Sequence, residues 1–259
     1  MKLAIITGAS SGIGKEFAKQ LAQTEIADEY WLIARTKSKL EELAACLSRP
    51  ATVLPMDLCD DEALDALAVR LAEEKPEVTC LVNAGGYGKF GHTEEIPLAE
   101  QRGMIDLNCR ALCSVTNLCL PYFVRGTQVY QMGSLSAFQP VPYLNVYAAT
   151  KAFVLSYSKG LAVELAPRGV QVMAVCPGWV KTAFFDRAET TSSTAITYFY
   201  HLYTADGVVK QALRDMKKHR RVSVHGKKTR LLLFFEKCIP ERLAMRIWLR
   251  QQGHSGKHA

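Results

Sequence analysis

The chain has 259 residues, a net charge of +7 and a hydrophobic fraction of 49%. These values are typical of one large globular domain or two small ones. They exclude a disordered chain and argue against a disulfide-rich scaffold. The charge is uneven, because residues 206–259 contain 14 Lys/Arg and 4 Asp/Glu, whereas residues 1–205 contain 18 and 21. The sequence therefore predicts a basic C-terminal patch and no nucleic-acid-binding surface on the rest of the protein.

The eight cysteines include no CxxC pair and have no histidine at metal-ligand spacing. We therefore expect no metal site and eight cysteines that are small, buried hydrophobic residues in a reducing compartment. The apolar stretch near the N-terminus, residues 3–6, is too short for a secretory signal or a membrane span. A cytoplasmic protein is expected, and the open alternative is a cytoplasmic protein held at a membrane surface.

Short apolar runs alternate with amphipathic segments along the first 175 residues. The runs have the length and the Val/Ile/Leu content of strands buried on both faces, and the segments between them have apolar residues at helical spacing. This alternation predicts an α/β fold, a single doubly wound domain with a parallel sheet and helices on both faces. The predicted strands are residues 3–6, 30–34, 52–56, 79–82, 128–132 and 170–175, and the predicted helices are residues 15–23, 40–47, 64–71 and 146–165.

A glycine-rich turn follows the first predicted strand and precedes a helical segment. Its glycines allow a tight turn and a close approach of the backbone to a pyrophosphate, which the free N–H groups of the helix N-terminus would bind. The spacing is GxxxGxG, which differs from the GxGxxG of the common dinucleotide fingerprint. Its place between a strand and a helix nevertheless predicts a dinucleotide-binding loop, with the sequence Gly8-Ala9-Ser10-Ser11-Gly12-Ile13-Gly14.

The end of the second predicted strand bears on the choice of dinucleotide. An NAD-binding fold usually has an acidic residue about 20 positions after the last glycine, where it binds the ribose hydroxyls. Counted from Gly14, that position is Ala34, and the next residue is Arg35. An arginine here can pair with a 2′-phosphate, so the sequence favours NADP(H) over NAD. The alternative is an ordinary surface arginine at the start of a helix.

Four further residues have the chemistry of a catalytic site. Tyr147 and Lys151 are four residues apart in a predicted helix and therefore share one face. Ser134 follows a predicted strand at the edge where α/β folds place reacting groups, and Asn108 lies in an earlier helical segment. Over about residues 1–225 the chain resembles the short-chain dehydrogenase/reductase family, classical type. The motifs that carry the resemblance, in chain order, are the glycine loop, Asn83-Ala84-Gly85, Asn108, Ser134, Tyr147/Lys151 and Pro177-Gly178.

The resemblance implies a Rossmann domain with a mostly parallel, seven-stranded sheet. It also implies that Tyr147 is the general acid/base, with Lys151 favouring the phenolate and holding the nicotinamide ribose. Ser134 would hydrogen-bond the substrate oxygen, and Asn108 would position a water that links Lys151 to solvent. No metal is needed, because hydride passes directly between cofactor and substrate. The structural alternatives are a helix-bend residue for Asn108, a turn residue for Ser134 and a packed helix face for Tyr147 and Lys151.

The resemblance also assigns residues around the cofactor. Asp57 and Leu58 would contact the adenine, and Gly85 would let the backbone approach the cofactor. The Val180 backbone and the Thr182 hydroxyl would hydrogen-bond the carboxamide. The full set expected at the cofactor is Gly8, Ser10, Ser11, Gly12, Ile13, Gly14, Arg35, Asp57, Leu58, Asn83, Ala84, Gly85, Tyr147, Lys151, Pro177, Gly178, Val180 and Thr182.

Two positions depart from the family pattern. Gly133 stands where many members have a second serine, and Ser11 stands where many NADP-preferring members have a basic residue. The second departure weakens the preference for NADP without reversing it.

Residues 183–205 form a long, apolar segment whose length is typical of a functional loop or lid. We expect it to cover the substrate, which favours a bulky, apolar ketone or secondary alcohol such as a hydroxysteroid. The resemblance to hydroxysteroid dehydrogenases and carbonyl reductases points the same way. The alternative is that its aromatic residues pack against the domain or a neighbouring subunit. The residues expected around the substrate are Leu135, Tyr143, Phe184, Phe185, Ile196, Tyr198 and Phe199.

Residues 227–259 form a C-terminal extension to the predicted catalytic domain, residues 1–226. Three arginines repeat every four positions within residues 240–251, which predicts a basic amphipathic helix. The helix could form the interface of a homodimer or homotetramer, dock on an anionic membrane surface, or shield the substrate loop. We favour an interface or docking role over contact with a membrane surface. Its charges and length exclude a membrane span.

Taken together, the motifs predict an oxidoreductase that transfers a hydride between NADP(H) and an apolar ketone or secondary alcohol. One alternative is a 3-oxoacyl or other lipid-carbonyl reductase at a membrane surface. Another is an NADP-binding regulator without turnover, against which the intact Asn-Ser-Tyr-Lys set argues.

Overall fold

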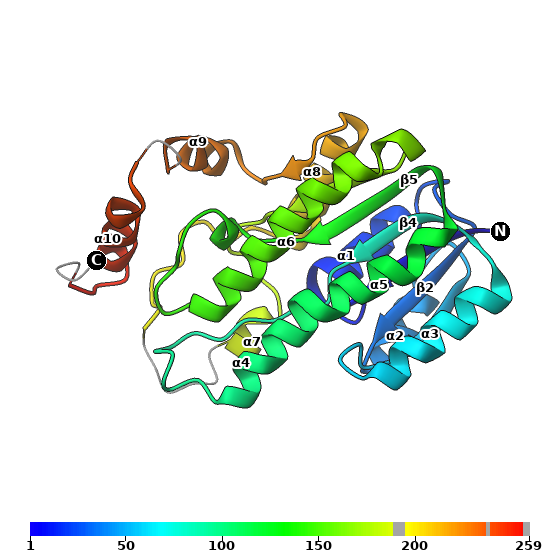
Figure 1. The fold of residues 1–259 in the computed structure, drawn as a ribbon, viewed down its shortest axis with the longest axis horizontal. Helices are drawn as coiled ribbons and strands as arrows, with labels where there is room; N and C mark the ends of the chain where they lie inside the picture. Colours follow the sequence, from blue (N-terminus) through cyan, green and yellow to red (C-terminus); the bar gives the residue numbers. More distant parts are fainter. Residues whose placement is uncertain (189–194, 237–238, 256–259) are drawn as a thin grey trace.

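A parallel β-sheet forms the centre of the protein (Figure 1). The computed structural model describes residues 1–188, 195–236 and 239–255. The sheet has seven strands in the order β3-β2-β1-β4-β5-β6-β7, and neighbouring strands are parallel. The predicted fold, a doubly wound Rossmann domain, is confirmed. The strands are β1 (Lys2–Thr7), β2 (Glu29–Ala34), β3 (Ala51–Pro55), β4 (Glu77–Asn83), β5 (Phe123–Met132), β6 (Gln171–Val175) and β7 (Val222–Ser223).

Helices cover both faces of the sheet because successive strand side chains point to opposite faces. In β1, Ala4 and Ile6 belong to a hydrophobic core that includes side chains of α1, α2 and α8. Leu3 and Ile5 belong to a second core, which includes side chains of α3, α5 and α6. The helices are α1 (Gly12–Leu21), α2 (Lys37–Ala45), α3 (Asp61–Glu74), α4 (Leu98–Ile105), α5 (Leu112–Cys119), α6 (Asn145–Glu164), α7 (Phe184–Ala188), α8 (Ala205–Lys217), α9 (Lys227–Glu236) and α10 (Glu241–Gln251).

The strand order reverses direction at β1. From β1 the chain proceeds to β2 and β3 on one side and returns to β4 on the other, so the connections that leave β1 and β4 diverge. At such a switch point the carboxyl ends of the strands leave a crevice in which α/β proteins bind ligands. The fold therefore places the glycine loop after β1 and the Ala84-Gly85 segment after β4 beside the same crevice.

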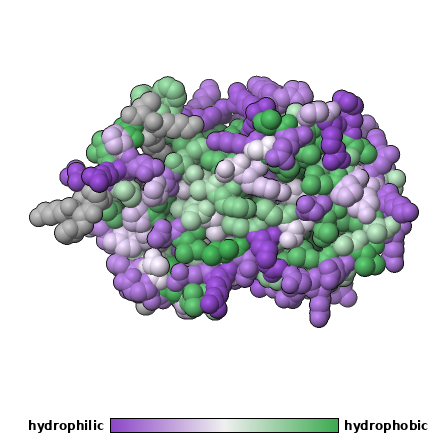
Figure 2. Space-filling model, viewed as in Figure 1, coloured by the Kyte–Doolittle hydropathy of each residue, from purple (hydrophilic) through white to green (hydrophobic). Residues whose placement is uncertain are grey.

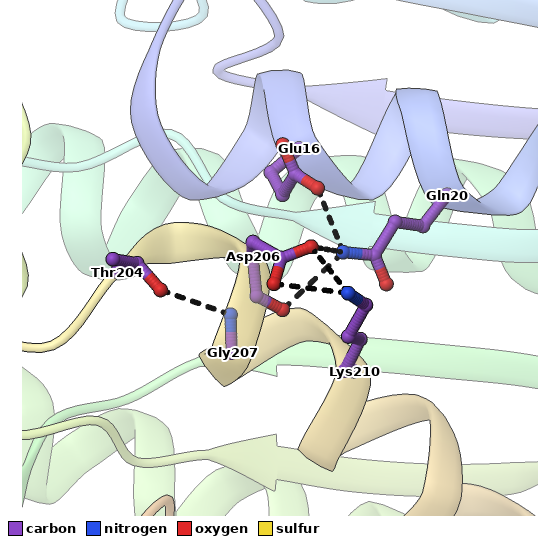
Figure 3. Close-up of polar contacts among 6 residues, drawn as sticks. All are labelled: Glu16, Gln20, Thr204, Asp206, Gly207 and Lys210. Atoms are coloured by element: carbon purple, nitrogen blue, oxygen red, sulfur yellow. Dashed lines mark hydrogen bonds and ion pairs between the residues drawn. The ribbon is translucent and has the colours of Figure 1, made fainter.

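Polar contacts join the N-terminal end of α8 to α1 (Figure 3). The Gln20 amide donates to the Asp206 backbone carbonyl at 3.3 Å and to Glu16 Oε1 at 2.7 Å. The Thr204 hydroxyl caps the helix by accepting a hydrogen bond from the Gly207 N–H. These contacts hold the first turn of α8 against α1.

The last two helices lie at the end of the molecule opposite the N-terminus (Figure 1). None of the helices in the described ranges has the length and apolar content needed to cross a membrane. Seven cysteines are free thiols, and Cys238 lies outside the described residues. The prediction that the cysteines are buried is wrong for Cys46, which is exposed at the end of α2. The predicted boundary between a domain of residues 1–226 and an extension of residues 227–259 stays a prediction.

Candidate active site

The glycine loop joins β1 to α1 with very little space around it. A Cβ atom at Gly8 would lie 2.7 Å from the backbone of Ala84 and Gly85, and a Cβ at Gly14 would lie 2.4 Å from the Gly8 carbonyl oxygen. Gly8 also has a φ of +65°, which disfavours other residues. The loop therefore needs glycine at these positions, and it aims the N-terminus of α1, which begins at Gly12, along the crevice.

A cavity of about 820 Å³ extends from the glycine loop to the last two helices. It is lined by the glycine loop, by the ends of β2 and β5, by the start of α6 and by the segment after β6. Most of the residues predicted from the sequence to bind the cofactor or react therefore surround one space. Those that line it are Gly8, Ser10, Ser11, Gly12, Ile13, Gly14, Arg35, Asp57, Leu58, Ala84, Gly85, Ser134, Tyr147, Lys151, Pro177, Gly178, Val180 and Thr182.

Asn83 does not line this cavity. Its side chain is buried below the strand ends, where its amide donates to Thr116 Oγ1 at 2.9 Å and to Gln131 Oε1 at 3.0 Å. Asn83 was predicted at the cofactor, but its side chain does not reach the cavity. The pleat of the strand turns the side chain of this last residue of β4 away from the crevice. Its amide connects β4, β5 and α5 beneath the site.

Tyr147 and Lys151 lie on the face of α6 that borders the cavity. The Lys151 Nζ donates to the Met132 carbonyl oxygen at 2.8 Å and lies 5.5 Å from the centre of the Tyr147 ring. The ring of Phe184 lies 5.4 Å from that of Tyr147 on the other side. Ser134 follows β5, and its hydroxyl accepts a hydrogen bond from the Ser136 N–H at 3.2 Å. Strand β5 and helix α6 thus bring a hydroxyl, a phenol and an amine to one end of the cavity.

Burial determines the protonation of the tyrosine and the lysine. It raises the pKa of Tyr147 to about 12, and the neighbouring Ser134 hydroxyl lowers that pKa only in part. Burial lowers the pKa of Lys151 to about 8. Burial is the largest cause of the shift in the Tyr147 pKa, and the predicted effect of Lys151 on the phenolate stays a prediction. Near neutral pH, Tyr147 is a phenol that can donate a proton.

Asn108 lies within a π-helical turn, η1 (Asp106–Ala111), between α4 and α5. Its side chain accepts from the Tyr87 N–H at 3.0 Å and donates to the Tyr87 carbonyl at 2.9 Å and to Thr150 Oγ1 at 3.0 Å. The amide therefore connects the helix to the chain after β4 and to α6, and it does not line the cavity. A Cβ at Gly86 would lie 2.8 Å from Asn108 Oδ1 and 3.3 Å from Lys151 Nζ, so both groups approach the same glycine.

Arg35 and Asp57 lie at the far end of the cavity from Tyr147. The Arg35 Nη1 lies 3.8 Å from Asp57 Oδ2, and the side chains are 63% and 36% exposed. A pair this exposed contributes little to stability, so its guanidinium can turn toward another anion at small cost. Asp57, the acidic residue at this end of the cavity, is therefore paired with Arg35.

The segment after β6 forms one wall between the two ends of the cavity. The Leu135 N–H donates to the Pro177 carbonyl at 2.9 Å, which joins this segment to the chain after β5. The Thr182 side chain packs against the glycine loop, because a Cβ at Gly12 would lie 3.2 Å from its methyl group. A parallel bridge between Val180 and Tyr203 then brings together the two ends of the segment predicted to cover the substrate.

The residues of this segment predicted around the substrate lie in three different environments. Phe184 and Phe185 line the cavity, whereas Ile196 and Phe199 pack in a hydrophobic cluster behind them and Tyr198 is exposed. Tyr143 was also predicted to lie around the substrate, and its position corrects that prediction. Its backbone has a φ of +65°, and its ring lies between His92 and His254 outside the cavity. Packing against the domain, the alternative stated for this segment, therefore applies to Ile196 and Phe199, and the covering of a substrate by Phe184 and Phe185 stays a prediction. Thr190 to Thr194, part of the same segment, lie outside the described residues.

Helix α10 supplies residues that the motifs did not identify. Trp248 lines the cavity, and its indole N–H donates to the Pro142 carbonyl at 3.1 Å. Gln252 is 4% exposed; its Oε1 accepts from the N–H groups of Thr197 and Tyr198, both at 3.0 Å, and its amide donates to the Tyr198 carbonyl. The tail therefore contacts the segment predicted to cover the substrate, and the shielding role stays a prediction. The only sequence signal was the apolar side of the amphipathic pattern.

Removal of the Gln252 amide is expected to loosen the substrate wall without affecting the dinucleotide end. For Gln252→Ala, which removes three hydrogen bonds, we expect KM for the predicted apolar substrate to rise about fivefold or more, with the dissociation constant for the predicted dinucleotide unchanged. Steady-state kinetics and a dinucleotide titration measure the two quantities. Glu241→Gln, an exposed residue on the same helix, is the control. An unchanged KM in Gln252→Ala would contradict this role.

A family model described as short chain dehydrogenase matches residues 2–193. The chain therefore belongs to the short-chain dehydrogenase/reductase family, as the motifs predicted, and it is an oxidoreductase of the classical type. A short-chain dehydrogenase from Sphingobium yanoikuyae, in complex with NADPH, has a similar structure with a TM-score of 0.77 and 30% identity, over 86% of this chain and 87% of that one. The fold and the family define a dinucleotide-dependent enzyme of the NAD(P)-binding type.

Two other proteins are similar over most of this chain. The bulky-bulky ketone specific alcohol dehydrogenase from Comamonas testosteroni superposes with a TM-score of 0.74 and 25% identity, over 92% of each chain. A very-long-chain 3-oxoacyl-CoA reductase of Yarrowia lipolytica is 34% identical in an alignment 209 residues long that covers 73% of this chain. The match covers 53% of that reductase, so this chain spans about half of its length.

Proposed function

We propose that this protein is an NADP(H)-dependent reductase of bulky, apolar ketones, also able to oxidise the corresponding secondary alcohols. One observation carries the proposal. The hydroxyl of Ser134, the phenol of Tyr147 and the amine of Lys151 meet in one cavity, which is bordered by the glycine loop at one end and by apolar side chains at the other. The glycine loop fits a dinucleotide, because its tight turn, in which a Cβ at Gly8 or Gly14 would clash with neighbouring backbone, places the N-terminus of α1 at the cavity wall.

Each reacting residue then has one task. When bound, the reduced nicotinamide supplies the hydride that is added to the carbonyl carbon. The carbonyl oxygen gains the electron pair of the C=O π bond and takes its proton from the Tyr147 hydroxyl. Ser134 donates a hydrogen bond to that oxygen as its charge develops, and Lys151 holds the nicotinamide ribose. The raised pKa of Tyr147 keeps the phenol protonated at neutral pH, which is the form that can give this proton to the carbonyl oxygen.

The proposed substrate class follows from the apolar end of the cavity, which lies opposite the glycine loop. Phe184, Phe185, Trp248 and Ile247 line it, so a ligand there would lose apolar surface from water. The names of two similar proteins, a bulky-bulky ketone specific dehydrogenase and a very-long-chain 3-oxoacyl-CoA reductase, support large carbonyl substrates. A panel of steroid, fatty-acyl, aryl and sugar ketones, each with NADPH and NADH, tests the proposal. Preference for a sugar ketone would contradict it.

The proposed preference for NADP(H) depends on Arg35. In Arg35→Ala, we expect KM for NADPH to rise by about 10- to 100-fold, the equivalent of one charged hydrogen bond to a phosphate, while KM for NADH changes little. Initial rates with both cofactors measure the ratio. Lys37→Ala is the control, because Lys37 is a nearby exposed cation paired with Glu41 instead of facing Asp57. Equal effects on the two cofactors would show that Arg35 does not bind the 2′-phosphate.

We further propose a homodimer or homotetramer in a reducing, cytoplasmic compartment. The compartment is supported by the seven free thiols in the described residues. The roles assigned to Asn108, in positioning a water, and to the other cofactor residues are part of the same proposal.

A further inference from the structure

The outer surface of α9 and α10 carries a group of exposed apolar side chains. Leu231, Phe234 and Phe235 share one face of α9 and are 58%, 63% and 57% exposed. Thr229 and Leu233, on the opposite face, are buried against the rest of the protein, so the exposed face is held outward. We call the exposed apolar residues of the two helices the C-terminal patch: Leu231, Leu232, Phe234, Phe235, Leu243 and Ile247.

Basic residues border the C-terminal patch. Lys227 and Lys228 lie one turn before Leu231, and α10 exposes a row of arginines next to Leu243 and Ile247. Residues 227–255 contain seven Lys/Arg and two Asp/Glu. Figure 2 shows hydrophobic side chains over α9 and strongly hydrophilic ones over α10. The row on α10 consists of Arg242, Arg246 and Arg250.

The C-terminal patch is continuous with the cavity. Leu232, Phe235 and Ile247 are exposed and also line the cavity, so they lie at its mouth. Behind them, Trp248 and Leu233 line the same space and are buried. An apolar path therefore leads from the exposed surface of α9 and α10 into the substrate end of the site.

We propose that the C-terminal patch docks on the surface of an anionic phospholipid bilayer. In that position the leucine and phenylalanine side chains of α9 enter the boundary between headgroups and acyl chains, and the arginines of α10 extend to the lipid phosphates. A second copy of the chain fits less well, because a twofold interface on this patch would bring two clusters of like charge together. Given the proposed function, the mouth would then open toward lipid, and apolar ketones dissolved in the bilayer could enter directly.

Vesicle binding without substrate or cofactor tests the docking independently of the reaction. We expect the protein to sediment with vesicles of equal parts phosphatidylglycerol and phosphatidylcholine, and less with phosphatidylcholine alone or at high salt. In Leu231→Ser/Phe234→Ser, neither of which lines the cavity, the partition coefficient should fall by about tenfold or more. Arg242→Gln/Arg250→Gln should also lower it by about tenfold with the anionic vesicles.

The controls separate docking from misfolding and from self-association. Val69→Ser changes an exposed apolar residue of α3 with 56% exposure and should bind vesicles like the wild type. Both double variants should reduce a water-soluble ketone at the wild-type rate, which shows that they fold. Failure of the wild type to bind anionic vesicles, or equal binding by Leu231→Ser/Phe234→Ser, would overturn the proposal. So would a lower molar mass of that variant in lipid-free solution, which would assign the patch to a second copy.

Discussion

Replacement of Tyr147 by phenylalanine is expected to lower kcat for ketone reduction by about a thousandfold, the middle of the range for loss of a general acid. The change removes the hydroxyl and keeps the ring, which packs against Phe184 at 5.4 Å. The fold and the dinucleotide end should therefore be preserved. Single-turnover rates with NADPH measure the chemical step, and a titration of the variant with NADPH checks binding.

A second tyrosine of the same helix provides the matched control. Tyr157 lies on α6 ten residues after Tyr147 and does not line the cavity. Tyr157→Phe also removes one hydroxyl from a partly buried ring, and we expect kcat within about twofold of wild type. If Tyr147→Phe reduces the ketone as fast as Tyr157→Phe, another group donates the proton and the catalytic assignment is wrong.

Lys151→Met is expected to make the protein more stable and nearly inactive. The lysine has a pKa of about 8 in the folded chain and 10.5 ordinarily, because burial disfavours its charge. At pH 7 this difference opposes folding by about 3 kcal/mol, and the hydrogen bond from Nζ to Met132 O returns about 1 kcal/mol. Methionine fills a similar volume without charge, so the free energy of unfolding should rise by about 2 kcal/mol.

The stability difference between Lys151→Met and the wild type should depend on pH. Between pH 8 and pH 10.5 the unfolded chain binds more protons at Lys151 than the folded chain does, so wild-type stability gains a rising contribution with pH in that window. The variant lacks this contribution, and the stability difference should shrink from pH 7 to pH 10.5. Urea unfolding at several pH values measures it, and kcat/KM should fall by about a hundredfold or more. A less stable variant with the same pH dependence as wild type would contradict a buried, destabilising lysine.

The strands could be predicted because each is a short apolar run between polar segments. The six predicted runs correspond to β1 to β6, and α1, α2, α3 and α6 overlap the predicted helices within a few residues at most ends. Strand β7 has two residues, too few for any pattern, and it was implied only by the family resemblance. The π-helical turn at Asn108 also has no pattern, because it depends on contacts with Tyr87 and Thr150.

The candidate site could be predicted in part because the carboxyl ends of parallel strands meet at one edge of the sheet. That rule places Ser134, Gly85 and Arg35 beside one cavity although they are far apart in the chain. It does not give side-chain direction, so Asn83 was placed in the crevice and is buried beneath it. It also gives no information on Gln252, whose partners are more than 50 residues earlier and carry no motif.

The two ends of the cavity come from different parts of the chain, so they should form at different times during translation. Every residue predicted to hold the dinucleotide precedes residue 183, whereas the wall formed by α9 and α10 is completed only by the last residues described. Domains begin to fold on the ribosome from the N-terminal side. A nascent chain that has emerged to residue 226 already contains all seven strands and could bind its dinucleotide. We expect the dinucleotide end of the cavity to form before the wall at its other end does.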